Sequence, residues 1–125
     1  MSLTFIETSR FAAVRDAVFG GLERYRLFQA SLFADPLSGT VIPGCGGIRD
    51  ARWSDPKLGT GTLSALHVIY LRVPEIDAIV LFGVYDKDET TSLTPDQKRA
   101  LTLAAQAARE ELLSNNALGM ARINR

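Results

Sequence analysis

The sequence holds one cysteine, one histidine and no long hydrophobic run, and each of these scarcities excludes a class of protein. One cysteine cannot form an intrachain disulfide, and one cysteine with one histidine falls short of the four ligands of a structural zinc site. The apolar stretches are far shorter than the roughly 20 residues of a membrane-spanning helix. No basic leader followed by an apolar segment opens the chain. We therefore expect a cytoplasmic protein without a metal, a cofactor or a membrane partner.

An excess of charge of either sign is also missing, because 14 Lys and Arg residues balance 14 Asp and Glu residues. Proteins that bind nucleic acid indiscriminately usually carry a large basic excess. The balance hides a local separation, since 41–72 is mildly positive and 73–92 carries five acidic residues against one lysine. The sequence therefore argues against a general polyanion binder and leaves room for a basic surface on one part of the domain.

The 125 residues, of which 46% are hydrophobic, suit a single domain (1–125) with one core. The short apolar segment Leu3–Glu7 predicts a strand. Over Phe11–Leu32 apolar residues recur every three or four positions, which is typical of a helix that packs on one face. Gly20-Gly21 interrupts this pattern, so two consecutive helices and one kinked helix both fit.

Three further strands are predicted after a loop at Pro36–Gly47. The segments Ile48–Trp53, Ser64–Val73 and Ile76–Tyr85 are joined by turn-forming residues, and the last two are rich in β-branched and aromatic residues. Short connections favour an antiparallel sheet. The last segment is apolar without alternation, as expected for a strand in the middle of a sheet that is covered on both faces.

The clearest local signal is Thr94-Pro95-Asp96-Gln97, which places threonine, proline and glutamine where a capping box begins a helix. Asn115-Asn116 and Gly119 predict the end of this helix, and 117–125 is expected to be a loose tail. The order of elements predicts an α+β domain, in which two N-terminal helices and one C-terminal helix pack on an antiparallel sheet.

Three features invite a site, each with a plainer interpretation. Gly44-Cys45-Gly46-Gly47 is similar to a phosphate-binding loop, but a strand is predicted after it, which favours a turn. Cys45 has no neighbouring base in the sequence, so an unreactive thiol is favoured over a nucleophile. Asp86, Asp88 and Glu89 lack the spacing of a calcium loop, which favours a solvated turn over a cation site.

The segment 41–53 reads VIPGCGGIRDARW and resembles the VIPGxGGxRKxRW pattern of the RelE/HigB-type toxins of bacterial toxin–antitoxin pairs. Other segments match the same family in order. Phe5-Ile6-Glu7-Thr8 resembles its opening strand, Val68-Ile69-Tyr70 its RVIYY strand, 84–89 its VYAKNE segment, and 93–98 its DLTPxxxK helix start. The resemblance runs from the first predicted strand to the last predicted helix.

The resemblance implies a RelE-like fold and an mRNA interferase, that is, an endoribonuclease that cuts translated mRNA at the ribosome without a metal and so inhibits translation. It implies the ribosome and mRNA as partners, together with an antitoxin that carries a helix-turn-helix domain and holds the toxin inactive. A homodimer is left open.

The resemblance also assigns roles to residues. Arg52 and Lys87 match basic residues of the family and would hold the phosphate, and His67, where an arginine is usual, would move a proton. Tyr85 completes the predicted catalytic set. The predicted RNA-binding residues are Arg49, Lys57 and Arg72. Without the resemblance, His67 would be read as a half-buried structural histidine. Arg49 and Arg52 are three apart, so an ideal strand would send them to opposite faces.

The chain departs from the family at two places. The turn that typically reads GKGKRGG is Gly-Thr-Gly-Thr-Leu-Ser-Ala over 59–65, and Asp50 stands where a basic residue is common. Each lost phosphate contact weakens RNA binding and lowers its salt dependence by about one unit of slope. The alternative interpretation is therefore a toxin-fold protein that has lost cleavage and acts only as a protein-binding module.

Overall fold

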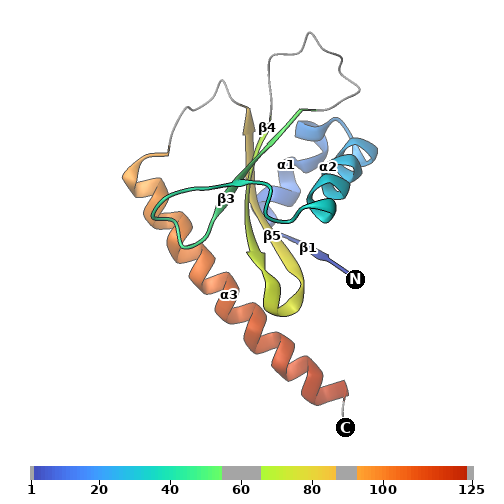
Figure 1. The fold of residues 1–125 in the computed structure, drawn as a ribbon, viewed down its shortest axis with the longest axis vertical. Coiled ribbons are helices and arrows are strands. Elements are labelled where there is room, and N and C mark those ends of the chain that lie inside the picture. The colour runs from blue at the N-terminus through green and yellow to red at the C-terminus, as the bar shows by residue number, and fades with distance from the viewer. Residues whose placement is uncertain (1, 55–65, 87–92, 124–125) are drawn as a thin grey trace.

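The structure of the protein, a computed structural model, describes residues 2–54, 66–86 and 93–123 (Figure 1). Within these residues, α1 and α2 cover one face of a five-stranded sheet and α3 covers the other. The elements are β1 (Thr4–Glu7), α1 (Ser9–Phe19), α2 (Leu22–Ala34), β2 (Thr40–Val41), β3 (Arg49–Trp53), β4 (Leu66–Val73), the 3-10 turn η2 (Pro74–Ile76), β5 (Ala78–Asp86) and α3 (Pro95–Ile123). The predicted α+β class is confirmed.

The sheet has the strand order β1-β5-β4-β3-β2. Its strands pair antiparallel except β1, which runs parallel to β5. The prediction of a wholly antiparallel sheet is wrong at this edge, because β1 is not joined to β5 by a hairpin and side-chain alternation carries no information on strand direction. β5 is an interior strand, as its unbroken apolar run indicates, but β4 takes the middle position.

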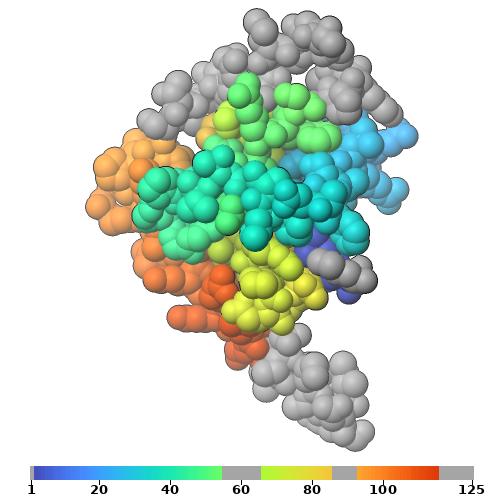
Figure 2. Space-filling model, in the orientation of Figure 1, coloured from blue at the N-terminus to red at the C-terminus, as the bar shows by residue number. Residues whose placement is uncertain are grey.

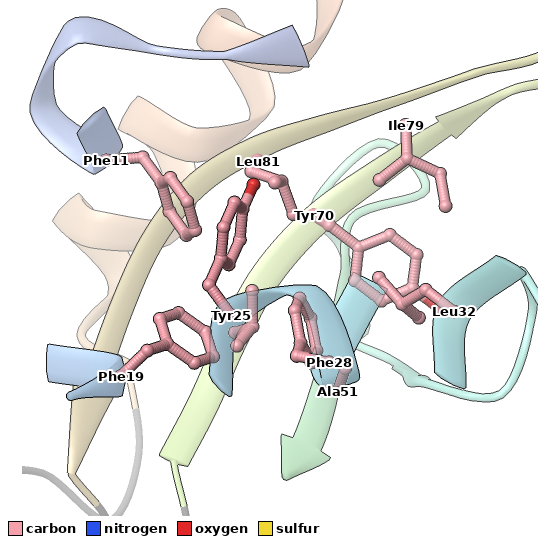
Figure 3. Packing of buried hydrophobic residues seen from close by; sticks show 10 residues of the cluster. Phe11, Phe19, Tyr25, Phe28, Leu32, Ala51, Tyr70, Ile79 and Leu81 are labelled. Atoms are coloured by element: carbon pink, nitrogen blue, oxygen red, sulfur yellow. The ribbon is translucent and has the colours of Figure 1, made fainter. Parts of the chain in front are cut away.

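The glycine pair divides the N-terminal apolar pattern into two helices. Gly20 and Gly21 have φ values of +83° and +122°, which residues with a side chain rarely adopt. The turn lets α2 fold back beside α1, so that Phe11, Phe19 and Tyr25 meet with ring centroids between 5.2 and 6.3 Å apart (Figure 3). This aromatic core holds both helices on one face of the sheet.

A second core lies on the opposite face, between the sheet and α3. Its buried residues are Cys45, Ile48, Ile69, Leu71, Val73, Ala78, Val80 and Ala105. The segment after α2, coloured cyan to green, crosses the surface from α2 to α3 (Figure 2). Because β4 and β5 bury side chains on both faces, their sequences lack the alternation of a half-exposed strand.

The glycine-rich motif is a turn that supports α3. Gly44, Gly46 and Gly47 have positive φ, and β3 follows the turn where a phosphate-binding loop would need a helix. The Gly44 carbonyl accepts a hydrogen bond from Thr102 Oγ1 of α3 at 3.1 Å. Cys45 is buried beneath the turn as a free thiol. These positions agree with the plainer interpretation of the motif.

α3 continues through Asn115-Asn116 to Ile123, and its C-terminal end extends past the β4–β5 turn (Figure 1). The predicted end at Asn115-Asn116 is wrong, and the backbone of 117–123, expected to be loose, is helical. One glycine in a helix costs only about 1 kcal/mol, and the Ala, Leu, Met and Arg residues around Gly119 favour helix. No helix in the described part of the chain combines the length and the apolar character that crossing a bilayer requires.

Candidate functional site

Three predicted catalytic side chains, Arg52, His67 and Tyr85, lie in one row across β3, β4 and β5. The register pairs Arg52 with His67 and His67 with Tyr85, and directly paired residues project from the same face of a sheet. Asp50, two residues before Arg52, projects from that face as well. Ile69, two residues after His67, belongs to the core beneath α3. The row therefore continues the α3 side of the sheet.

The imidazole of His67 is held by Asp50. His67 Nδ1 lies 3.0 Å from both carboxylate oxygens of Asp50, and each side chain is about one-quarter exposed (22% and 24%). In the neutral ring, this carboxylate keeps the proton on Nδ1 and leaves Nε2 with a free lone pair. The contact thus orients the ring, and in its neutral form it leaves Nε2 as the nitrogen that is able to accept a proton.

Tyr85 covers one face of the same imidazole. The two rings are stacked, with centroids 5.0 Å apart and an interplanar angle of 7°. Tyr85 Oη donates a hydrogen bond to Asp50 Oδ2 at 3.4 Å. Partial burial, and then the neighbouring Asp50 carboxylate, raise the pKa of Tyr85 above its ordinary value of 10.0. The phenol therefore stays protonated at neutral pH.

Arg52 is the cation of this row. It is exposed, and no side chain or carbonyl in the described part of the chain engages its guanidinium. A planar guanidinium offers donors that match two oxygens of one phosphate. Lys87, the other predicted phosphate ligand, and Lys57 lie outside the described residues.

The other two predicted RNA-binding arginines lie away from the row. Arg49 projects from the opposite face, as the three-residue spacing predicts, and donates to two backbone carbonyls after α2 at 3.1 and 2.7 Å. Arg72 is five residues from His67 along β4, a rise of roughly 17 Å. It donates to a β5 carbonyl and to Asp77. Both guanidinium groups therefore form hydrogen bonds within the protein.

A groove of about 640 Å³ opens beside Tyr85, between the same face of the sheet and the first turns of α3. Pockets for small ligands occupy roughly 300–1,000 Å³. The lining includes Ile69, Gly83 and Tyr85 of the sheet, Ala100, Leu101 and Ala104 of α3, and Arg10 of α1. Tyr85 therefore belongs both to the row and to the groove.

Asp50 and Arg10 are absent from the predicted site residues. In the structure, Asp50 lies in the row and Arg10 lines the groove. In the sequence, Asp50 stands out only as an acidic residue where the resembled family is commonly basic. Its spacing of two from Arg52 is the one signal that the two side chains share a face of the strand. The contact with His67 joins residues 17 apart in the chain. Arg10 reaches the groove because β1 pairs with β5, and no short-range pattern predicts that pairing.

Within 2–54, 66–86 and 93–123, no group of three or more His, Cys, Asp or Glu side chains is arranged to hold a metal ion. Asp88 and Glu89 of the predicted acidic cluster lie outside these residues. A scan of the sequence against models of known protein families found no match. The function therefore has to follow from the chemistry of the row and the groove.

Proposed function

We propose that the protein is an endoribonuclease of the RelE/HigB toxin type, which cuts translated mRNA at the ribosome and is neutralised by a helix-turn-helix antitoxin. The observation that supports this best is the orientation of His67 by Asp50 beside Arg52, whose guanidinium no residue in the described part of the chain engages. A proton acceptor and a phosphate-binding cation on one open face are what RNA cleavage by the ribose 2′-hydroxyl requires. The resemblance of 41–53 to the toxin family is the reason for proposing mRNA as the substrate and the ribosome and an antitoxin as the partners.

In the proposed reaction, His67 Nε2 takes the proton of the ribose 2′-hydroxyl while the 2′-oxygen attacks the adjacent phosphorus. Arg52 donates to the phosphate oxygens and stabilises the charge that builds up on them. The bond from phosphorus to the 5′-oxygen breaks, the leaving oxygen takes up a proton from a solvent water, and His67 releases the proton that it accepted to the resulting hydroxide. The products are a 2′,3′-cyclic phosphate and a 5′-hydroxyl. Tyr85 supports His67 by stacking, and Lys87 is proposed as the second phosphate ligand.

The balanced charge of the chain supports a requirement for the ribosome. With 14 basic and 14 acidic residues, the protein lacks the basic excess that gives strong binding to free RNA. A ribosome that already holds the mRNA would position the phosphate at the site, so that the protein's own binding free energy for RNA can be small. The reaction should therefore be much slower on free mRNA than on mRNA in a translating ribosome.

The test is induction of the chain in cells, followed by mapping of mRNA 5′ ends on ribosomes. We expect arrested growth and cuts in phase with codons, and we expect His67→Ala to abolish both. Arg52→Gln should lower the cleavage rate roughly 10²–10³-fold, as loss of one charge-stabilising donor typically does. Asp50→Asn should also slow cleavage, because an amide facing Nδ1 favours the tautomer that carries its proton on Nε2.

Arg99→Gln is the matched control, because Arg99 is an exposed arginine of α3 that pairs only with Asp96 among the described residues. It should cleave like the wild type. Unchanged growth without phased cuts in the wild type, or equal cutting by His67→Ala, would contradict the proposed activity.

The structure also favours a second candidate function, that of a toxin-fold protein that binds a partner without cutting RNA. Two of the predicted RNA-binding cations, Arg49 and Arg72, are engaged within the fold, and Asp50 adds a negative charge beside Arg52. Under this alternative, His67→Ala leaves every phenotype unchanged. The triple change Thr60→Lys, Thr62→Lys and Leu63→Arg is then expected to create toxicity.

A further inference from the structure

We infer that the groove between β5 and α3 binds the nucleobase next to the phosphate held by Arg52, and that Arg10 pairs with the following phosphate. This inference rests on the proposed function and names the part of the RNA that lies beyond the row. The groove and the row share Tyr85, so an RNA strand that crosses the sheet from β3 to β5 enters the groove directly.

The floor of the groove is open at Gly83, which follows an irregularity in β5. The register pairs Ile69 with Gly83 but Tyr70 with Leu81, so Phe82 is an extra residue in β5. A Cβ built on Gly83 would meet no atom within 4 Å. The missing side chain therefore leaves a space against the sheet, between the ring of Tyr85 and the first turns of α3.

The lining suits a flat, partly apolar ligand. Ile69, Leu101 and Ala104 offer apolar surface, and the ring of Tyr85 offers a face on which a base can stack. Gln97 also lines the groove, and its Oε1 accepts the Thr94 N–H, which leaves the amide Nε2 to donate to a base. Stacking surface with one amide donor is a common way to hold an unpaired base.

The charges at the two sides of this path suit a nucleic acid strand. Arg52 lies on β3, and β5 is two strand spacings away, or about 10 Å. Arg10 lies beyond β5 at the start of α1, is exposed, and has no hydrogen-bond or ion-pair partner among the described residues. A base in the groove would thus lie between two guanidinium groups that none of the described residues engages, and each could pair with a phosphate that flanks the base.

The experiment measures binding of a 2′-O-methylated dinucleotide that ends in a 3′-phosphate, and therefore offers one phosphate on each side of its second base, by amide NMR of the full chain. The methyl group removes the attacking hydroxyl. The comparison ligand is the same molecule with an abasic second position. We expect the amide of Gly83 to shift with the complete dinucleotide, and we expect the abasic ligand to bind at least tenfold more weakly. Arg10→Gln should lower the salt dependence of binding by about one unit of slope.

Two variants fill the groove from different sides. Gly83→Val adds a side chain in open space with a residue that strands favour, and Ala104→Leu enlarges a residue of the α3 wall. Each should weaken binding of the complete dinucleotide at least tenfold. Ala107→Leu, on the exposed side of α3, should bind like the wild type. Thermal unfolding of each variant establishes that the loss does not come from misfolding.

Equal binding of the two dinucleotides, or unchanged binding in both Gly83→Val and Ala104→Leu, would overturn the inference. A groove that gives no shift with the dinucleotide but shifts with a protein partner would overturn it too. The mapping of mRNA 5′ ends tests the proposed cleavage independently of this binding experiment. A wild type that binds the base in the groove without cutting mRNA would support this inference and contradict the activity.

Discussion

At the scale of single residues, Tyr70 and Arg49 hold the loop that follows α2. Tyr70 Oη accepts the Gly39 N–H at 3.0 Å and donates to the Pro36 carbonyl at 2.9 Å. Arg49 donates to the Gly39 carbonyl at 2.7 Å. An arginine that family resemblance assigns to RNA binding thus satisfies backbone carbonyls on the opposite face from His67. Its position on the strand, rather than its residue type, decides its role.

The contact between Gly39 and Tyr70 predicts a large difference between two glycine substitutions. A Cβ at Gly39 would lie 2.7 Å from Tyr70 Cε1 and 2.8 Å from its Oη, so Gly39→Ala should lower the free energy of unfolding by roughly 1–3 kcal/mol. Gly83→Ala, which meets open space, should change it by less than about 0.5 kcal/mol. Urea denaturation measures both. Equal midpoints for the two variants would contradict this packing.

At the scale of elements, the start of α3 shapes the groove wall. Thr94 Oγ1 accepts the Gln97 N–H at 3.1 Å, and Gln97 Oε1 accepts the Thr94 N–H at 2.9 Å. This capping box is the one that the sequence predicts, and the pairing satisfies backbone groups that a helix start leaves open. The same box fixes the position of Gln97 beside the groove.

Removing the cap should therefore destabilise α3 from its first turn. Thr94→Ala should lower the free energy of unfolding by about 1 kcal/mol, and it should also loosen amide protection in the first turn. Ser114→Ala, an exposed position inside the helix, should leave stability equal or slightly higher because alanine favours helix. Chemical denaturation and hydrogen exchange measure these effects. A Thr94→Ala protein as stable as the wild type would show that tertiary packing alone defines the helix start.

At the scale of the whole molecule, all three tyrosines of the chain have a pKa above the ordinary value of 10.0. Burial is the largest cause for each of them. A hydrogen bond to Glu7 adds to the rise for Tyr25, and the Asp50 carboxylate adds to it for Tyr85. The three side chains lie in both cores and in the row, so their ionisation reports on the entire fold.

These shifts predict alkaline unfolding. Above about pH 10 the unfolded chain loses tyrosine protons that the folded chain retains, so stability is full below that pH and falls as pH rises through the raised pKa values. Melting temperatures should stay level from pH 8 to about pH 10 and decline from there to pH 11.5, and tyrosinate absorbance should appear together with unfolding. Tyr85→Phe should make the decline shallower. Tyrosinate absorbance near pH 10 in a protein that is still folded would contradict the prediction.

The sequence by itself determined the elements whose signals are local. The capping box of α3 depends on the conformations of a few adjacent residues, and the structure confirms it. The paired glycines indicated an interruption that fitted either two helices or one kinked helix, and the structure has two helices there. The helix end near Asn115-Asn116 was predicted wrongly because asparagine and a single glycine weaken a helix without stopping it. Local chemistry therefore located most elements, and failed where the signal was weak.

Only the tertiary structure decided the direction of β1 and the composition of the site. Pairing β1 parallel to β5 joins segments more than 70 residues apart, and it brings Arg10 to the groove. The Asp50–His67 contact depends on the register between β3 and β4. The alternation of residues along a strand indicates which side chains share a face. It does not indicate which strand will pair with it or in which register, because pairing and register arise from the free energy of packing the whole sheet against its helices.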